Sequence, residues 1–348
     1  MSTSQNEEND TFKILVATDI HLGFKHLDPH RGRDSIHTFR EILQLARQNE
    51  VDFVLLGGDL FHENKPPRAA MHGCLQLLRE YCVGDKPQSF QLVDVDTPGS
   101  VLSTNIDNPN LNISMPVFSI HGNHDEPTGP QLLSALDVIE SAGLIHYFGK
   151  TSSIEELRVA PLLLQKGRTK LALYGVGYIR SNKLHQMYLN KAVTMTRPEQ
   201  DTDGWFNVFV LHQNRVKRPD KTHIEESFID DFIDLVIWGH EHESKIKPER
   251  SREGKFWVTQ PGSTIATEFK RSEMVQKHVG LLTIHGREFE LTPIPLLTVR
   301  QLFIVDYTPS GQIVGSVEDH AAVQRLIRYC TDRVEDLLSN AGQLSTTK

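Results

Sequence analysis

The sequence has no long apolar run and few cysteines, and each shortage excludes a class of protein. No segment approaches the ~18 consecutive apolar residues that a membrane-spanning helix needs, so we expect no association with a membrane. The three cysteines, Cys74, Cys82 and Cys330, are odd in number and form no C-x-x-C pair. This usage is typical of free thiols in a reducing compartment and excludes a disulfide framework.

Positively charged residues are fewer than negatively charged ones. The 348 residues include 37 Lys and Arg against 45 Asp and Glu, which gives a net charge of -8. This balance argues against a broad nucleic-acid-binding face, although a local basic patch or bound cations would reverse the field. The opening residues, MSTSQNEENDT, are polar and acidic, so they are neither a signal peptide nor a transit peptide. We expect residues 1–11 to be disordered.

What is present is a regular alternation of apolar strands and amphipathic helices, which predicts an α/β core with largely parallel pairing. Strands are predicted at 12–18, 52–58, 116–120, 170–177, 206–212, 234–240 and 255–261, and helices at 34–50, 66–82, 129–143 and 318–340. Residues 84–114 interrupt this rhythm and are too long for a routine connection, so we expect a functional loop there. After Pro295 we expect a strand-like piece, a turn with glycine, and the last helix.

Polar side chains follow the carboxyl ends of five of these strands, where open α/β sheets gather their sites. The residues are Asp19 and His21, then Asp59, His62 and Glu63, then Asn123, His124 and Asp125, then His212, and finally His240 and His242. Each cluster alone has an ordinary explanation, such as a turn, a helix cap or a solvated surface. Five clusters on one side of a sheet need a common partner, and a cationic centre provides one.

The number and type of donors indicate two metal ions. Seven side chains qualify as ligands, namely Asp19, His21, Asp59, Asn123, His212, His240 and His242. Seven exceeds the four to six positions around one ion and suits two ions that share a carboxylate. The mixture of imidazole and carboxylate favours Mn, Fe or Zn over Mg or Ca. Two such ions are the usual device for displacement at phosphorus.

Two basic runs leave the predicted metal centre. RVKRPDK (215–221) follows His212, and KIKPERSREGK (245–255) follows His242. A charge run is most often a solvated face, but here the runs are placed to bind phosphates on either side of the scissile one. The candidate DNA-binding residues are Lys65, Arg215, Lys217, Arg218, Lys245 and Lys247. No motif that reads a nucleic-acid sequence is visible, so a nucleic-acid partner would be recognised by its backbone and by the shape of its ends.

The order of these motifs, D-x-H, G-D, G-N-H-D, a lone His and G-H-x-H, resembles the calcineurin-like metallophosphoesterase superfamily across residues 12–265. Longer strings, such as LLGGDLFHENKP and SIHGNHDEPTG, are similar to the eukaryotic double-strand-break repair nucleases of meiotic recombination, whose bacterial counterparts are SbcD nucleases. The resemblance implies a four-layer α-β-β-α sandwich over 12–295. It also implies a nuclear, manganese-dependent enzyme with single-strand endonuclease and 3′-5′ double-strand exonuclease activities.

The same resemblance implies a role for each site residue. Asp19, His21 and His242 would hold one Mn²⁺ ion, Asn123, His212 and His240 the other, and Asp59 would bridge them. His124 matches the catalytic histidine that protonates the leaving oxygen. Asp125 would orient the imidazole of His124, and His62 matches a histidine that places the DNA backbone. The alternative for His62 is an ordinary surface histidine. Glu126 departs from the aspartate expected in relatives.

Partners also follow from the resemblance. Helices 66–82 and 129–143 correspond to those that form a homodimer as a four-helix bundle, although their apolar faces also suit an ordinary core. Loop 84–114 corresponds to the segment that meets a nibrin-type partner. An SMC-like ATPase would bind C-terminal elements mostly absent from this chain. Residues 296–348 are expected to be the start of a small capping domain that relatives complete.

Two other functions are compatible with the sequence. A phosphoprotein or small-molecule phosphatase would use the same metal centre, and it would hydrolyse monoesters faster than diesters. A non-catalytic scaffold of the same fold would lack a ligand, and the sequence lacks none of the seven.

Overall fold

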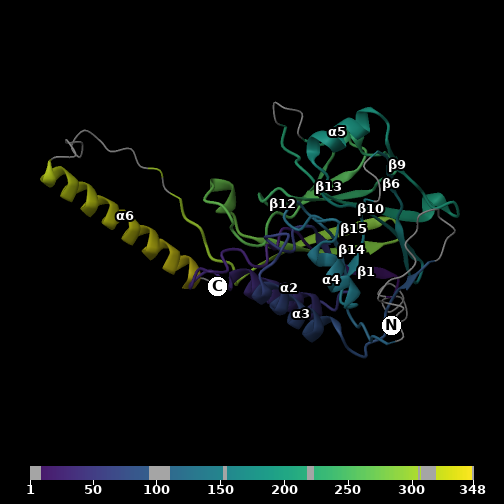
Figure 1. Ribbon diagram of the computed structural model, residues 1–348, viewed down its shortest axis with the longest axis horizontal. Helices are drawn as coiled ribbons and strands as arrows, with labels where there is room; N and C mark the ends of the chain where they lie inside the picture. The colour runs from purple at the N-terminus through teal and green to yellow at the C-terminus, as the bar shows by residue number, and fades with distance from the viewer. Residues whose placement is uncertain are drawn as a thin grey trace.

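The fold is built on two β-sheets that face each other (Figure 1). The structure is a computed structural model that describes residues 9–93, 110–151, 155–217, 223–304, 306 and 319–346, with side chains in the last helix described to residue 339. The seven strands predicted between residues 12 and 261 are all present, with ends that differ by at most two residues. In the described part of the chain, no helix combines the length and apolarity that a membrane span requires.

The first sheet has six strands in the order β15-β14-β1-β2-β4-β5. Their bounds are β1 (Thr11–Ala17), β2 (Phe53–Gly57), β4 (Val117–Ile120), β5 (His146–Tyr147), β14 (His278–His285) and β15 (Glu288–Pro295). The four strands from β1 to β5 run parallel, and the hairpin of β14 and β15 adds antiparallel pairs at the β1 edge. This hairpin was not predicted from the sequence.

The second sheet has seven strands in the order β12-β13-β11-β10-β8-β7-β3. Their bounds are β3 (Gln91–Leu92), β7 (Leu162–Lys166), β8 (Thr169–Val176), β10 (Trp205–His212), β11 (Leu235–Gly239), β12 (Lys245–Arg250) and β13 (Trp257–Gln260). Its centre is parallel and its edges are antiparallel. A separate pair joins β6 (Leu157–Val159) and β9 (Val193–Met195).

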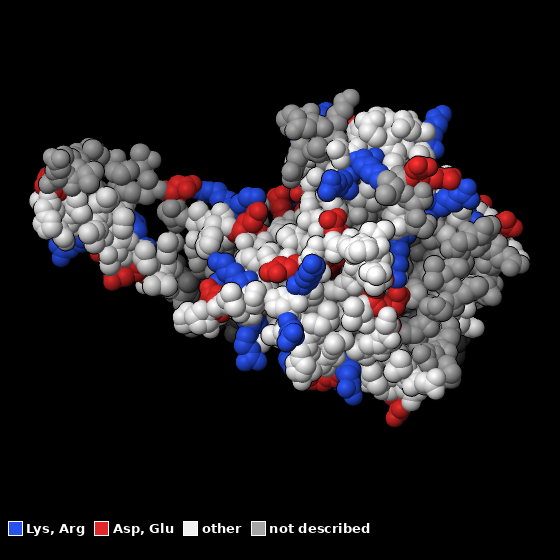
Figure 2. All heavy atoms as spheres, viewed as in Figure 1, with Lys and Arg blue, Asp and Glu red and all other residues white. Residues whose placement is uncertain are grey.

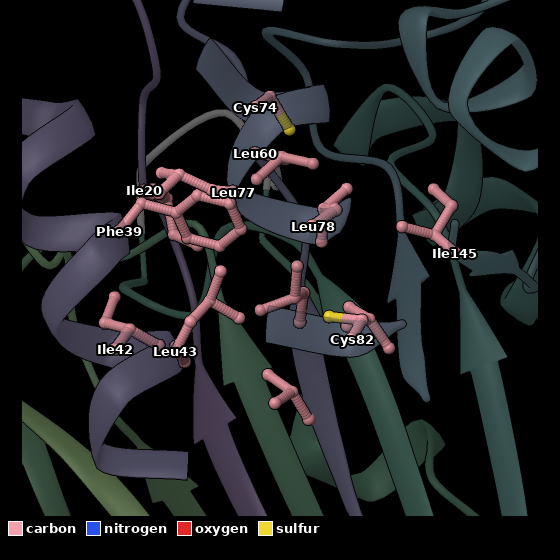
Figure 3. Close-up of a cluster of buried hydrophobic side chains, with 14 of the residues drawn as sticks. Ile20, Phe39, Ile42, Leu43, Leu60, Cys74, Leu77, Leu78, Cys82 and Ile145 are labelled. Atoms are coloured by element: carbon pink, nitrogen blue, oxygen red, sulfur yellow. The ribbon is translucent and has the colours of Figure 1, made fainter. Parts of the chain in front are cut away.

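Helices cover the outer faces of both sheets, which gives the predicted four layers. The helices α2 (Asp34–Gln48), α3 (Arg68–Cys82) and α4 (Ala135–Ser141) contribute buried residues to the core outside the first sheet, and α5 (Ser181–Leu189) to the core outside the second. Figure 3 shows side chains of α2 and α3, among them Phe39 and Leu77, gathered over the first sheet. All three cysteines are free, and Cys74 and Cys82 are buried in this core.

Alternation along β1 explains why its sequence is almost continuously apolar. Phe12, Ile14 and Val16 are buried between the two sheets, whereas Leu15 and Ala17 are buried under the helices. Both faces of the strand are therefore covered, as in parallel sheets generally. Burial on both faces leaves the end of each strand as the place where polar side chains can meet.

The predicted helix at 129–143 is wrong in its first half, because α4 begins at Ala135. Ser134 caps it, accepting from the main-chain N–H groups of Leu136 and Asp137, and the Asp137 carboxylate accepts in return from the N–H of Ser134. This reciprocal capping box fixes the start of the helix. Leu132 and Leu133 precede it and are exposed.

Three other expectations need revision at the ends of segments. Asp10 is buried and pairs with Arg168, so order begins before the predicted boundary at residue 12. Residues 91–92 of the predicted loop 84–114 form β3, and residues 94–109 lie outside the described part of the chain. No strand follows β15 within residues 296–304, and most of 305–318 is not described. The final helix is α6 (His320–Thr346), which Figure 1 shows set apart from the sheets.

The two faces of α4 predict opposite responses to truncation. Leu136→Ala should lower the free energy of unfolding by about 2–5 kcal/mol, because Leu136 is fully buried and its loss leaves a cavity. Val138→Ala is the matched control, since Val138 is 55% exposed and should change this quantity by less than about 0.5 kcal/mol. Urea denaturation measures both, and equal losses would contradict the assigned burial.

Candidate metal centre

The carboxyl ends of β1, β2, β4, β10 and β11 meet at one junction between the two sheets. The imidazole of His212, at the end of β10, donates from Nδ1 to the main-chain oxygen of Gly57 in β2, at 2.8 Å. The main-chain N–H of His240, just after β11, donates to Asp19 Oδ2 at 3.1 Å. These bonds join one sheet to the other at the point where the predicted ligands lie.

The backbone at this junction adopts a conformation that side chains usually avoid. Asp19, His21, Asp59 and His240 all have positive φ, at 53°, 52°, 52° and 81°. This conformation is unfavourable for residues other than glycine, and four of the nine such residues in the described part of the chain lie at this junction. Four of the seven predicted ligands therefore sit on strained turns that aim their side chains inward.

Gly122 lies beside these residues at a position where no side chain fits. A Cβ atom on Gly122 would lie 2.0 Å from Asp59 Oδ1. The glycine of the G-N-H-D motif thus lets the β4 end approach the carboxylate of the β2 end. The approach places the main-chain N–H of His124 2.8 Å from the same oxygen, to which it donates.

The donor atoms form two groups that share the space beside Asp59. Asp19, His21 and His242 offer one atom each, all within 4.8 Å of one another, and Asp59, His212 and His240 do the same. Asp59 Oδ2 lies 3.2 Å from His212 Nε2 and 3.9 Å from His21 Nε2, so it faces both groups. Asn123 Oδ1 lies 2.8 Å from His240 Nδ1, which places it with the second group.

This cluster fits a pair of cations. Asp19 Oδ1 and His212 Nε2 are buried, have no hydrogen-bond partner among the described residues, and face each other at 3.9 Å. Burial raises the pKa of Asp19. Burial opposes protonation of His212, but the carboxylates of Asp59 and Asp19 raise its pKa to about 10. Buried carboxylates and imidazole nitrogens without partners are the groups that a divalent cation satisfies.

In two of the predicted ligands, His240 and His242, the ring nitrogen on the far side has a partner that fixes the direction of the ring. For His240 the partner is Asn214 Oδ1, at 2.8 Å from Nε2. For His242 it is Glu273 Oε1, at 3.1 Å from Nδ1. Burial raises the pKa of Glu273, but its hydrogen bond with His242 and the Lys277 ammonium lower it to about 2.

Sequence reasoning missed Asn214 and Glu273. Asn214 is two residues after His212, and the same alternation used for Asp19 and His21 would have found it. Glu273 lies 31 residues after His242, at the end of a short 3₁₀ helix (Arg271–Glu273) that carries no motif, so only the fold brings it to the site.

His124 and His62 lie together at the edge of the first group. Their rings stack with centroids 4.9 Å apart, and the His124 ring is 4.9 Å from the ring of His21. His124 Nδ1 donates to the main-chain oxygen of His62 at 2.7 Å, which leaves Nε2 to face the site. His62 Nδ1 is 3.4 Å from His21 Nδ1.

The predicted contact between Asp125 and His124 is wrong. The Asp125 carboxylate accepts from the main-chain N–H groups of Gly122 at 2.6 Å and Phe61 at 3.2 Å. The imidazole of His124 donates to the carbonyl of His62 and not to Asp125. Burial and the nearby charge of Asp59 raise the pKa of Asp125 to about 7. Asp125 therefore ties the β4 end to the β2 end and does not orient the imidazole directly.

The predicted DNA-binding residues differ in how free their charges are. Arg215 is turned inward, with its guanidinium 3.2 Å from Glu226 and 3.1 Å from Gln260. Lys245 pairs with Glu243 at 2.9 Å, while Lys65, Lys217 and Lys247 are exposed. Arg218 lies outside the described residues. A cavity of about 660 Å³ is lined by Arg215, Lys217 and Lys245, so the two basic runs border one hollow.

These features agree with the comparison to known proteins. The sequence profile of the calcineurin-like phosphoesterases matches residues 12–244, and the chain belongs to that family. Among individual proteins, it is 51% identical to the double-strand break repair protein MRE11 of Rattus norvegicus over 97% of this chain. It is 50% identical to MRE11 of Homo sapiens over 98% of the chain and 42% identical to MRE11 of Oryza sativa subsp. indica over 98%.

The chain spans about half the length of the curated relatives it matches, 49% of the rat and human proteins. Among solved structures, TT1561 of Thermus thermophilus aligns with a TM-score of 0.42 and 13% identity over 81% of this chain and 99% of that one.

Metal binding should stabilise the fold, because the cluster is assembled only in the folded state. Mn²⁺ at a hundredfold excess over the dissociation constant should raise the free energy of unfolding by about 2.7 kcal/mol per site. Asp59→Asn should abolish most of this gain, since Asp59 faces both donor groups. The matched control is Glu63→Gln, an exposed carboxylate on the same loop. Thermal unfolding with Mn²⁺ or EDTA measures the gain, and an unchanged gain in Asp59→Asn would contradict the site.

Proposed function

We propose that this protein is a manganese-dependent DNA nuclease that acts in double-strand-break repair and meiotic recombination in the nucleus. Its activities would be endonucleolytic on single strands and 3′-5′ exonucleolytic on duplex ends. The observation that carries the proposal is the convergence of seven metal donors with the imidazole of His124 at their edge. The likeness to MRE11 repair proteins over nearly the whole chain supports the substrate.

Each residue has a defined task in this proposal. Asp19, His21 and His242 would hold one ion, Asn123, His212 and His240 would hold the other, and Asp59 would be shared between them. When bound, the two ions supply charge neutralisation at the phosphodiester and a water of lowered pKa. His124 uses Nε2 to protonate the leaving oxygen, because the His62 carbonyl holds Nδ1 away from the site. The ring of His62, stacked on His124, contacts the DNA backbone.

DNA would be held by its phosphates at the hollow beside the metal centre. Lys217 and Lys245 line this hollow and are exposed, Lys247 is exposed on β12, and Lys65 is exposed on the loop after β2. Figure 2 shows basic and acidic side chains interspersed over the face in view, so the attraction must be local. Phosphate contacts of this kind position a nucleic acid without reading its sequence.

Single substitutions of two adjacent residues, Asn123 and His124, distinguish metal binding from proton transfer. His124→Asn should keep both ions and DNA binding but lower the cleavage rate by about 10²–10⁴-fold, because general acid catalysis typically accelerates a reaction by that factor. Asn123→Ala removes a ligand, so its activity should recover in part at high Mn²⁺. Circular single-stranded DNA and end-labelled duplex are the substrates, and Mn²⁺ occupancy is measured in parallel.

The control for this pair is His37→Asn, an exposed histidine on α2, which should cleave like wild type. Loss of an ion from His124→Asn, or its recovery with added Mn²⁺, would make His124 a ligand and reverse the assigned roles. Faster hydrolysis of p-nitrophenyl phosphate than of DNA by the wild-type protein would favour the phosphatase alternative.

The partners are proposed from surfaces and from the relatives. An SMC-like ATPase and a nibrin-type protein are the expected partners, the latter at loop 84–114, and residues 296–348 are proposed as the start of a capping domain. A homodimer would form through α3 and the α4 region, where Leu132, Leu133 and Val138 are 68%, 55% and 55% exposed. Leu136 belongs to the core and takes no part in that surface.

Charged side chains on this exposed surface should therefore give monomers. Leu133→Glu combined with Val138→Glu should halve the mass measured by light scattering while leaving the circular dichroism spectrum unchanged. Leu189→Glu on α5 is the control, because Leu189 is 53% exposed on the opposite sheet's helix. A dimer that survives the double change would place the interface elsewhere.

A further inference from the structure

A buried ion pair lies directly behind one of the ligand histidines. Glu273 and Lys277 are 3% and 2% exposed, and Lys277 Nζ lies 2.6 Å from Glu273 Oε2. Lys277 Nζ also donates to Ser263 Oγ at 2.9 Å and to the main-chain oxygen of His242 at 3.2 Å. The pair thus holds both the side chain and the backbone of the loop that carries His242.

The contact between Glu273 and His242 fixes the proton on the imidazole. A carboxylate can only accept, so His242 Nδ1 donates to Glu273 Oε1 at 3.1 Å. Nε2 is then left with its lone pair, and it faces His21 Nε2 at 3.1 Å and Asp19 Oδ1 at 3.7 Å. Thr267 Oγ1, 2.9 Å from Nδ1, occupies the same side of the ring as Glu273.

The acceptor behind His242 differs from those behind the histidines of the second group. His212 donates to a main-chain carbonyl and His240 faces an amide oxygen, both uncharged. A charged acceptor increases the basicity of the imidazole and so strengthens its bond to a metal. The two groups of predicted ligands therefore differ in the charge of the acceptor behind their histidines, although their seven side chains alone do not show this difference.

Stability does not account for the pair. Burying two opposite charges costs desolvation that their attraction barely offsets, and apolar residues of similar volume are often as stable. We propose that Glu273, held in place by Lys277, is a positioning residue that fixes the tautomer of His242 and selectively tightens the ion held by Asp19, His21 and His242. This inference rests on the metal centre of the proposed function but not on the substrate.

Metal affinity tests the proposal without any measurement of cleavage. Glu273→Gln keeps the shape of the side chain and removes its charge, so one of the two Mn²⁺ dissociation constants should rise by about 10–100-fold. The other should stay within about threefold of wild type. Titration followed by the electron paramagnetic resonance signal of free Mn²⁺ resolves the two constants.

The matched control is Glu268→Gln on the same loop, an exposed carboxylate paired with Lys270, and it should leave both constants unchanged. Two wild-type constants in Glu273→Gln would overturn the proposal. Equal weakening of both ions, in step with a lower midpoint of unfolding in EDTA, would reduce Glu273 to a structural role. A wild-type protein that binds no pair of ions would instead defeat the proposed function itself.

A measurement on the wild-type protein covers the case in which Glu273→Gln fails to fold. Histidine-selective ¹⁵N NMR of the metal-free protein, at a pH high enough to keep His242 neutral and with His242 assigned by comparison to His242→Asn, reports which ring nitrogen carries the proton. We expect the proton on Nδ1. A proton on Nε2 would contradict the proposal outright.

Discussion

The structure depends on holding Asp19 and Asp59 together where two sheets meet. Both carboxylates are almost completely buried, and each belongs to a turn with positive φ that ends a parallel strand. Such a concentration of negative charge away from water is unfavourable unless cations or hydrogen-bond donors surround it. The main-chain N–H of His124 donates to Asp59 and that of His240 donates to Asp19, which meets part of this requirement. The layers of sheet and helix serve to bring these groups to one point.

Local patterns in the sequence were enough to predict the central strands and to place the candidate ligands at their carboxyl ends. β1 and β10 are covered on both faces, so a polar residue that follows such a strand is predicted to lie at the edge of the sheet where the strand ends. Spacing of two residues was enough to pair Asp19 with His21 and His240 with His242. The sequence shows the glycine of the G-N-H-D motif, but only the fold explains it: Gly122 packs against the carboxylate of Asp59, where no Cβ atom would fit.

Contacts that depend on distant segments escaped prediction. Nothing near Asp125 in the sequence indicates that its carboxylate accepts from the main-chain N–H of Phe61, or that His124 donates to the carbonyl of His62. The start of α4 was missed because Leu132 and Leu133 continue the apolar pattern, whereas Ser134 and Asp137 decide the boundary by their hydrogen bonds. The freedom of a basic residue is equally a tertiary property, as the inward guanidinium of Arg215 illustrates.

The loop that carries His242 has a mechanical consequence. Lys277 immediately precedes β14, which pairs with β1 in the first sheet, yet its ammonium contacts the main chain of His242, which follows β11 in the second. The bond from His212 to Gly57 spans the same divide. Sliding of one sheet over the other would therefore move the predicted ligands of the first sheet relative to those of the second. The two bonds oppose that movement, because each joins one sheet to the end of a strand in the other.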